Sequence, residues 1–222
     1  MEQVKSQNIV QNTVIEEIAD AISSGSMKAI SDLVQKAVAS GADPMEILNR
    51  GMIEAMSVVG ERFSRGEAFV PEMMISARTM KKGVETLKPY LSSDATGANG
   101  KVVIGTVAGD MHDIGKNLVA LMIESAGFEV IDLGTDVSGE RFIKAISEQP
   151  NVKVVALSTL LTTTMPSMKN IVASLNALEN RASFHVMVGG APITEEFAKA
   201  IGADSYSADA ASAAAKAKAF VA

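Results

Sequence analysis

The chain has 222 residues, 47% of them hydrophobic and 21% charged, which is enough apolar sequence to bury one or two domain cores. Its 20 basic and 26 acidic residues give a net charge of −6, which argues against nucleic acid as a partner. Cysteine is absent and histidine occurs only twice, so disulfides, thiolate metal sites and multi-histidine zinc sites are excluded.

The apolar residues do not form a membrane segment. No apolar run reaches the roughly 18 residues that a helix needs to span a bilayer. Residues 1–11 lack the basic-then-apolar layout of a signal peptide. We therefore expect a cytoplasmic protein with no membrane partner.

The first part of the chain shows helical periodicity only. Apolar side chains recur at steps of three and four, and turn-forming residues interrupt the pattern at 23–25, 41–44 and 64–67. Asp43 directly before Pro44 fits a helix N-cap with proline in the first turn. The pattern predicts a four-helix bundle domain over residues 1–91.

A linker and a second domain follow. Residues 92–100, SSDATGANG, are small and polar, as is typical of a domain boundary. Over residues 101–222, short β-rich runs alternate with helical stretches, which predicts an α/β domain with a doubly wound parallel sheet of the flavodoxin-like, Rossmann type. Strands are expected at 101–106, 129–133, 152–158, 185–188 and 204–206, and helices at 114–125, 139–148, 165–178, 195–201 and 208–220.

The loop after the first predicted strand carries the most polar cluster in the domain. Ligands of such sheets bind outside the carboxyl ends of the strands, where this loop lies. Its residues 109–117, GDMHDIGKN, match neither a phosphate loop nor a dinucleotide fingerprint. His112 with Asp110 two residues away fits a single metal-ligating imidazole whose ring N–H is held by a carboxylate. A loop histidine without a ligand role is the alternative.

Three motifs in register resemble those of cobalamin-binding domains. Residues 110–115, DMHDIG, are similar to the D-x-H-x-x-G signature, Ser158-Thr159-Leu160 to the S-x-L motif, and Gly189-Gly190 to the double glycine. Residues 60–63, 69–73 and 76–78 resemble the helical cap of methionine synthase and of small corrinoid proteins. The resemblance covers nearly the whole chain and points to stand-alone corrinoid proteins of methyltransferase systems.

The resemblance implies a role for individual residues. His112 would be the lower axial ligand of cobalt in place of the cofactor's dimethylbenzimidazole, Asp110 would bind the far ring nitrogen, and Thr164 would supply a hydroxyl beyond Asp110. The remaining cofactor contacts implied are Gly109, Met111, Asp113, Ile114, Gly115, Ser158, Leu160, Thr162, Gly189, Gly190 and Ala210, the two adjacent glycines leaving room for the nucleotide tail. Phe63, Val70 and Met73 would cover the upper corrin face, or else pack in the bundle core.

The function implied is that of a non-catalytic methyl carrier. Cob(I)alamin would accept a methyl group from a donor-specific methyltransferase, and methyl-cob(III)alamin would pass it to a second methyltransferase that uses tetrahydrofolate or a thiol. A reductive activase would be a third partner. O-demethylation of aryl methyl ethers is the favoured system, with methanol, methylamines and betaines also open. A cobalamin storage, delivery or sensing protein without methyl turnover is the alternative.

Overall fold

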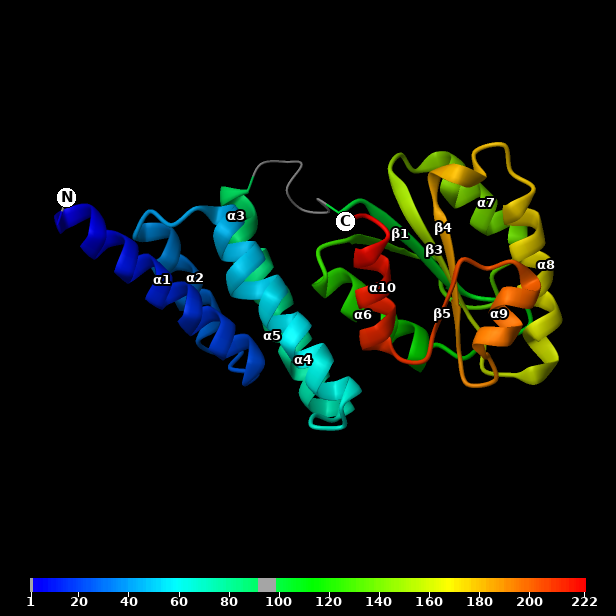
Figure 1. Cartoon of the computed structure of the whole chain (residues 1–222), viewed down its shortest axis with the longest axis horizontal. Helices are drawn as coiled ribbons and strands as arrows, with labels where there is room; N and C mark the ends of the chain where they lie inside the picture. Colours follow the sequence, from blue (N-terminus) through cyan, green and yellow to red (C-terminus); the bar gives the residue numbers. More distant parts are fainter. Residues whose placement is uncertain (1, 92–98) are drawn as a thin grey trace. The chain divides into compact units, whose positions relative to one another are not determined.

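The computed structural model describes residues 2–91 and 99–222, with side chains from residue 11 onward in the first range. The chain forms two compact units, Met1–Thr96 and Gly97–Ala222 (Figure 1). Residues 92–98 of the predicted linker lie outside the described residues. The predicted boundaries at residues 91 and 101 stay predictions.

The first unit is helical, as its periodicity predicts. Its helices are α1 (Glu2–Ser23), α2 (Ile30–Ala39), α3 (Pro44–Glu46), α4 (Glu54–Ser64) and α5 (Val70–Leu87), with a π-helical segment at Ile47–Ile53 and a 3-10 turn at Lys88–Tyr90. Because the π-helical segment joins α3 to α4, the described part of this unit has the four long helical segments that the sequence predicts. The core is apolar and includes Ile18, Ile22, Ile30, Val34, Ile47, Met52, Met73 and Leu87.

The N-cap predicted at Asp43 is confirmed. The backbone N–H of Met45 donates to the Asp43 carboxylate at 3.0 Å, and Pro44 occupies the first turn. At the start of α5, the Glu72 carboxylate accepts a hydrogen bond from the backbone N–H of Phe69 at 2.8 Å. Each of these side chains satisfies a backbone donor that the helix itself leaves unpaired.

The second unit is a parallel sheet covered by helices on both faces. Its strands are β1 (Lys101–Thr106), β2 (Glu129–Asp132), β3 (Val152–Ser158), β4 (His185–Gly189) and β5 (Ser205–Ser207). They pair in the order β2-β1-β3-β4-β5, and all four pairings are parallel. This order is that of flavodoxin-like sheets, so the predicted fold class is confirmed.

The helices of this unit form two layers. They are α6 (Ile114–Ser125), α7 (Gly139–Glu148), α8 (Met165–Asn176), α9 (Glu195–Ile201) and α10 (Ala210–Ala219), with 3-10 turns at Thr162–Thr164 and Arg181–Ser183. Figure 1 shows α6 beside α10 on one face of the sheet and α7, α8 and α9 on the other. Burial from both sides explains why β1 and β3 are nearly continuous apolar runs.

The strand order places a topological switch point between β1 and β3. The chain leaves β1 toward β2 on one side, and leaves β3 toward β4 on the other. The loops that follow these two strands therefore diverge, and the crevice between them is where open α/β sheets bind ligands. Residues 107–113 and 159–161 form these two loops.

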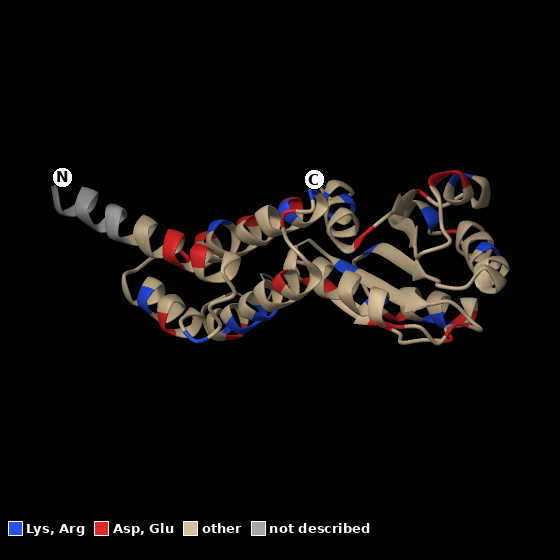
Figure 2. Cartoon of the chain, turned by 90° about the horizontal axis from the view of Figure 1, so that it is seen from below, with Lys and Arg blue, Asp and Glu red and all other residues tan. Residues whose placement is uncertain are grey.

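Charged residues are spread over the helices of both units. Figure 2 shows acidic and basic residues interleaved along the helices of both units. Among the described residues, none of the helices combines the length and apolar character that crossing a bilayer requires.

Candidate functional site

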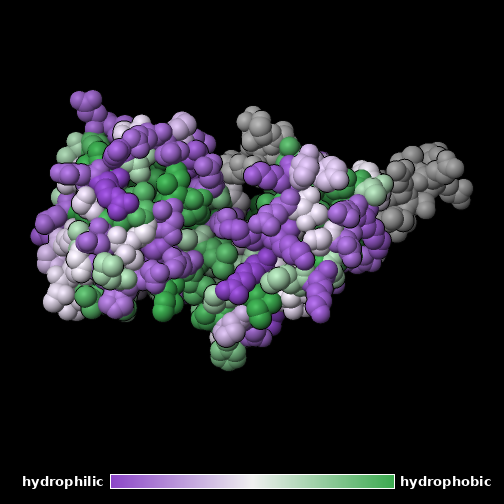
Figure 3. Space-filling view, turned by 180° about the vertical axis from the view of Figure 1, so that it is seen from behind, coloured by the Kyte–Doolittle hydropathy of each residue, from purple (hydrophilic) through white to green (hydrophobic). Residues whose placement is uncertain are grey.

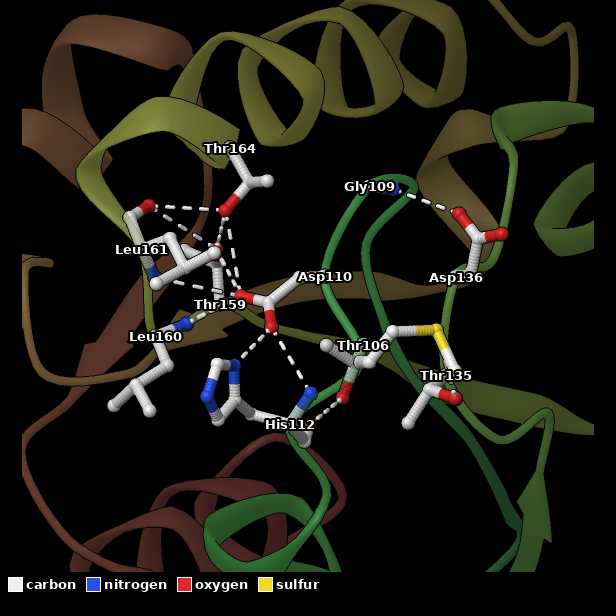
Figure 4. Close-up of polar contacts among 11 residues, drawn as sticks. Thr106, Gly109, Asp110, His112, Thr135, Asp136, Thr159, Leu160, Leu161 and Thr164 are labelled. Atoms are coloured by element: carbon white, nitrogen blue, oxygen red, sulfur yellow. Dashed lines mark hydrogen bonds and ion pairs between the residues drawn. The ribbon is translucent and has the colours of Figure 1, made fainter.

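The two loops at the switch point are joined through Asp110 and His112. The Nδ1 atom of His112 lies 2.7 Å from Oδ1 of Asp110, and the backbone N–H of His112 donates to the same oxygen at 3.0 Å. The His112 side chain is 52% exposed, whereas that of Asp110 is fully buried. With Nδ1 on the carboxylate, the other ring nitrogen, Nε2, points away from Asp110 and is open to a ligand (Figure 4).

The second oxygen of Asp110 binds the loop that follows β3. The backbone N–H of Leu160 donates to Oδ2 at 2.7 Å, and the Thr159 hydroxyl donates to it at 2.9 Å (Figure 4). Burial alone would raise the pKa of Asp110. Hydrogen bonds from the backbone of His112 and Leu160, and from the side chains of His112 and Thr159, outweigh burial and hold that pKa well below its usual range.

Asp110→Asn is expected to destabilise the apo protein by about 2–3 kcal/mol at pH 7, because an amide nitrogen would face hydrogen-bond donors in a buried position. A carboxyl group whose pKa is lowered by folding contributes stability above its unfolded pKa of about 3.9, and this contribution is lost as the pH falls further. Urea unfolding is measured from pH 7 down to pH 3 for the unchanged protein and for Asp110→Asn. The difference between their free energies of unfolding should become smaller below about pH 4. A difference that stays constant with pH would contradict a charged Asp110.

The loop that carries His112 is held from two further elements. The buried Thr106 hydroxyl, at the end of β1, donates to the carbonyl of His112 at 2.8 Å. In the loop after β2, Asp136 accepts a hydrogen bond from the backbone N–H of Gly109 at 2.7 Å, and its own N–H donates to the carbonyl of Asp110 at 3.0 Å. Asp136 has a φ of 53°, a left-handed conformation that non-glycine residues seldom adopt. The backbone around Asp110 is thus fixed from both sides.

Lys116 supports the next turn of the chain. Its side chain is almost completely buried, with 2% exposed, and its ammonium group pairs with Asp132 at the end of β2. It also donates to the Asn117 side chain at 2.6 Å. This ion pair between a buried lysine and an exposed aspartate ties the first turn of α6, directly after the His112 loop, to the neighbouring strand.

The double glycine lies beside Thr159. A Cβ on Gly190 would lie 1.8 Å from the carbonyl oxygen of Thr159, and the φ of Gly190 is +126°. A Cβ on Gly189 would lie 3.0 Å from the Ser207 carbonyl oxygen. These contacts within the chain are sufficient to require glycine at 190, whereas the resemblance to cobalamin-binding domains implies that both glycines leave room for a ligand.

Gly115, in the first turn of α6, is different. A Cβ there would meet no described atom of the chain within 4 Å. Nothing within the described fold therefore requires glycine at 115, and its missing side chain leaves backbone open to an external group.

Large apolar side chains on these two loops and at the first residue of α6 are exposed to solvent. Met111 is 70%, Ile114 85%, Leu160 45% and Leu161 38% exposed. Figure 3 shows apolar surface on one face of each unit. A half-exposed imidazole on loops rich in exposed apolar side chains fits a large apolar group with one coordination position to fill.

Comparison with known proteins identifies the family. A family model described as a B12 binding domain matches residues 100–216, more than half of the chain, and a second B12 binding domain model matches residues 14–88. The chain belongs to the B12-binding corrinoid proteins. Among similar curated proteins, the dimethylamine corrinoid protein of Methanosarcina barkeri is 42% identical over 206 residues, which cover 92% of this chain and 96% of that protein. A corrinoid protein of Desulfitobacterium hafniense (strain Y51) is 38% identical over 197 residues, covering 87% and 91%.

Solved structures agree with this assignment. A cobalamin-binding protein from Desulfitobacterium hafniense DCB-2 matches with a TM-score of 0.79 and 33% identity, covering 94% of this corrinoid protein and 98% of that chain. A chain of the methanol:cobalamin methyltransferase complex from Methanosarcina barkeri matches with a TM-score of 0.81 and 29% identity, covering 94% and 80%. Both likenesses extend over the helical and the α/β units.

The structure of this corrinoid protein brings most of the predicted site residues of the α/β unit to the switch point. Thr164 lies 3.3 Å from Oδ2 of Asp110, and Ser158 ends β3 in register with Thr106 and Gly189. The remaining predicted members of the two loops and of α6 are Gly109, Met111, Asp113, Ile114, Gly115 and Leu160.

Other predicted residues are placed less directly. Thr162 is exposed on the 3-10 turn after the β3 loop. Ala210 is the first residue of α10 and is buried. In the helical unit, Phe63 is half-buried and Val70 is 39% exposed, but Met73 is fully buried.

For Met73 the structure fits the second of the two expectations, packing in the bundle core, because its side chain is fully buried there. The apolar seam of α5 that contains Met73 explains this burial.

Sequence reasoning missed four residues of this corrinoid protein that hold the site. The backbone of the His112 loop is bound by Thr106 and Asp136, and the Asp110 carboxylate is bound by Thr159. Lys116 anchors the turn that follows the loop. Thr159 had a usable signal, since it is the middle residue of the S-x-L motif. The other histidine, His185, is partly buried and stacks on Phe220 with ring centroids 4.1 Å apart.

Proposed function

We propose that this chain is a methyl carrier that binds a corrinoid with His112 as the lower ligand of cobalt and works with separate methyltransferases. The observation that carries the proposal is the 2.7 Å contact between Asp110 and Nδ1 of His112, which leaves Nε2 open on a half-exposed ring. A metal that is already held by a macrocycle has room for one protein nitrogen as a lower ligand. When bound, the corrinoid supplies a nucleophilic cobalt that takes up a methyl group and releases it to an acceptor.

The residues of the two loops fit such a cofactor. Asp110 fixes the tautomer and direction of the His112 ring. The exposed side chains of Met111, Ile114 and Leu160 supply an apolar surface for the macrocycle. The open space at Gly115 fits close approach of the nucleotide tail to the backbone.

The partners proposed are a donor-specific methyltransferase, a second methyltransferase that uses tetrahydrofolate or a thiol, and a reductive activase. Curated relatives are named for dimethylamine and trimethylamine, and one structural relative comes from a methanol:cobalamin methyltransferase complex. These names favour methylamine or methanol as donors over the aryl methyl ethers favoured from the sequence.

The test is reconstitution followed by methyl transfer. The full chain is incubated with hydroxocobalamin, passed through gel filtration and reduced. Methyltransferases specific for dimethylamine, trimethylamine, methanol and an aryl methyl ether are then added, each with its substrate. We expect each chain to retain about one corrinoid. We also expect the absorbance of the bound corrinoid to show methylation when an amine or methanol methyltransferase is added with its substrate. Retention without methylation in any system would favour storage or delivery, and failure to retain a corrinoid would overturn the proposal.

A further inference from the structure

Two threonine hydroxyls lie next to the buried carboxylate of Asp110. Thr159 is 1% exposed and Thr164 is 7% exposed. The Thr159 hydroxyl lies 2.9 Å from Oδ2 of Asp110, the Thr164 hydroxyl lies 3.3 Å from it, and the two hydroxyls are 2.5 Å apart (Figure 4). The resemblance to cobalamin-binding domains places one hydroxyl beyond the aspartate, at Thr164. This chain has a second, and it is the nearer one.

Counting protons decides which hydroxyl the carboxylate binds. Each threonine hydroxyl has one proton to donate. A charged carboxylate is a stronger acceptor than a neutral hydroxyl or carbonyl oxygen, so the Thr159 proton goes to Oδ2 of Asp110 at the shorter of the two distances. The contact between the two hydroxyls then needs the Thr164 proton. The carbonyl of Leu161, 2.9 Å from the Thr164 hydroxyl, still accepts the backbone N–H of Thr164 at 3.2 Å.

The backbone of Thr159 is itself fixed by the end of β4. Its N–H donates to the carbonyl of Gly189 at 3.2 Å, and its carbonyl oxygen occupies the space that a Cβ on Gly190 would need. The Thr159 hydroxyl therefore approaches Asp110 from a backbone that has little freedom to move. Together with the N–H of Leu160 on the same oxygen, it fixes the plane of the carboxyl group.

We propose that Thr159 is the positioning residue for the Asp110–His112 pair, and that Thr164 acts on Asp110 through Thr159. The hydrogen-bonded series runs from Thr164 to Thr159 to Oδ2 of Asp110, and from Oδ1 to Nδ1–H of His112. Its role in holding a corrinoid rests on the proposed function, but the orientation of His112 in the apo protein does not.

The test uses NMR of the apo protein labelled with ¹⁵N-histidine, at pH 8. The chain has two histidines, and His185, stacked on Phe220 at the first residue of β4, serves as the internal reference. Thr159→Val keeps the side-chain shape and removes the hydroxyl, Thr159→Ser restores the hydroxyl, and Thr164→Val is the matched control. Thr159→Ala replaces Thr159→Val if the valine variant does not fold.

We expect the Nδ1–H signal of His112 to exchange with water about tenfold faster in Thr159→Val, the factor for loss of one hydrogen bond to a charged group. Thr159→Ser should return the unchanged rate, Thr164→Val should give a smaller increase, and His185 should not change. A Thr164→Val effect equal to or larger than that of Thr159→Val would overturn the proposal, as would an unchanged His112 signal in Thr159→Val.

A parallel measurement separates this proposal from the proposed function. The unchanged chain and Thr159→Val are loaded with hydroxocobalamin and passed through gel filtration. If the unchanged chain holds no corrinoid, the proposed function fails while the NMR result still decides the role of Thr159. If it holds the corrinoid and the NMR signals of Thr159→Val are unaltered, the role of Thr159 fails alone.

Discussion

His112→Ala is expected to leave the apo fold nearly unchanged and to remove the protein nitrogen from cobalt. The His112 side chain is half-exposed, and Asp110 keeps its backbone donors from His112 and Leu160 when the ring is lost. The cost to apo stability should therefore be about 1 kcal/mol, that of one hydrogen bond. Loss of a group that only orients a metal ligand lowers the affinity for the metal roughly 10–100-fold. Loss of the ligand His112 itself should lower the affinity for hydroxocobalamin by at least as much.

Electron-spin resonance of the reduced, cobalt(II) form tests the ligand directly. A ¹⁴N ligand splits the cobalt lines into triplets and a ¹⁵N ligand splits them into doublets. Protein labelled with ¹⁵N-histidine and loaded with unlabelled cobalamin should therefore give doublets, whereas a benzimidazole ligand would give triplets. His185→Ala is the matched control, because His185 begins β4 whereas the His112 loop follows the end of β1. Triplets in the labelled protein would remove His112 from the metal.

The sheet was readable from the sequence because both of its faces are buried. The predicted strands at 101–106 and 152–158 coincide with β1 and β3, two interior strands with nearly continuous burial. The helix predicted at 114–125 likewise coincides with α6. By contrast, the π-helical segment at Ile47–Ile53 changes the hydrogen-bond step without breaking the apolar pattern, so periodicity alone gives no sign of it.

The partners of the site residues were harder to predict than the site itself. Asp110 and His112 are two residues apart, so their contact is local and a motif can record it. Thr159 meets Asp110 from 49 residues away. That contact depends on the parallel pairing of β1 with β3, which brings the ends of the two strands together. The S-x-L motif contains Thr159 only as its variable middle residue, so the sequence does not name Asp110 as the partner of Thr159.

Met73 shows a different limit. An apolar residue in a helical seam is predicted to lie on an apolar face, but the seam does not say whether that face meets other helices or a ligand. The structure places Met73 in the bundle core and leaves Val70, one turn earlier, partly exposed. Periodicity therefore predicted the face correctly and could not assign its partner.

Gly190→Ala is expected to destabilise the apo protein by at least about 3 kcal/mol, since backbone strain and overpacking each cost about 1–3 kcal/mol. The new Cβ would lie 1.8 Å from the Thr159 carbonyl oxygen, which is backbone and cannot rotate away. Relief of this contact would move Thr159, so the orientation of Asp110 and His112 should also be disturbed. Urea unfolding of the apo protein measures the first effect. Wild-type stability in Gly190→Ala would show that the two loops do not approach as closely as the structure has them.

Gly115→Ala is the matched comparison, because the same atom is added where no described atom lies within 4 Å. In the apo protein it should be neutral, or stabilising by up to about 1 kcal/mol, since alanine favours helix over glycine. Its effect should appear only with a ligand, as weaker binding of hydroxocobalamin in equilibrium dialysis. We expect Gly190→Ala to lower the stability of the fold and Gly115→Ala to lower only the affinity for hydroxocobalamin. This result would show that the chain itself requires glycine at 190 and that the cofactor requires glycine at 115. Undiminished affinity in Gly115→Ala would mean that the cofactor does not approach α6 at this residue.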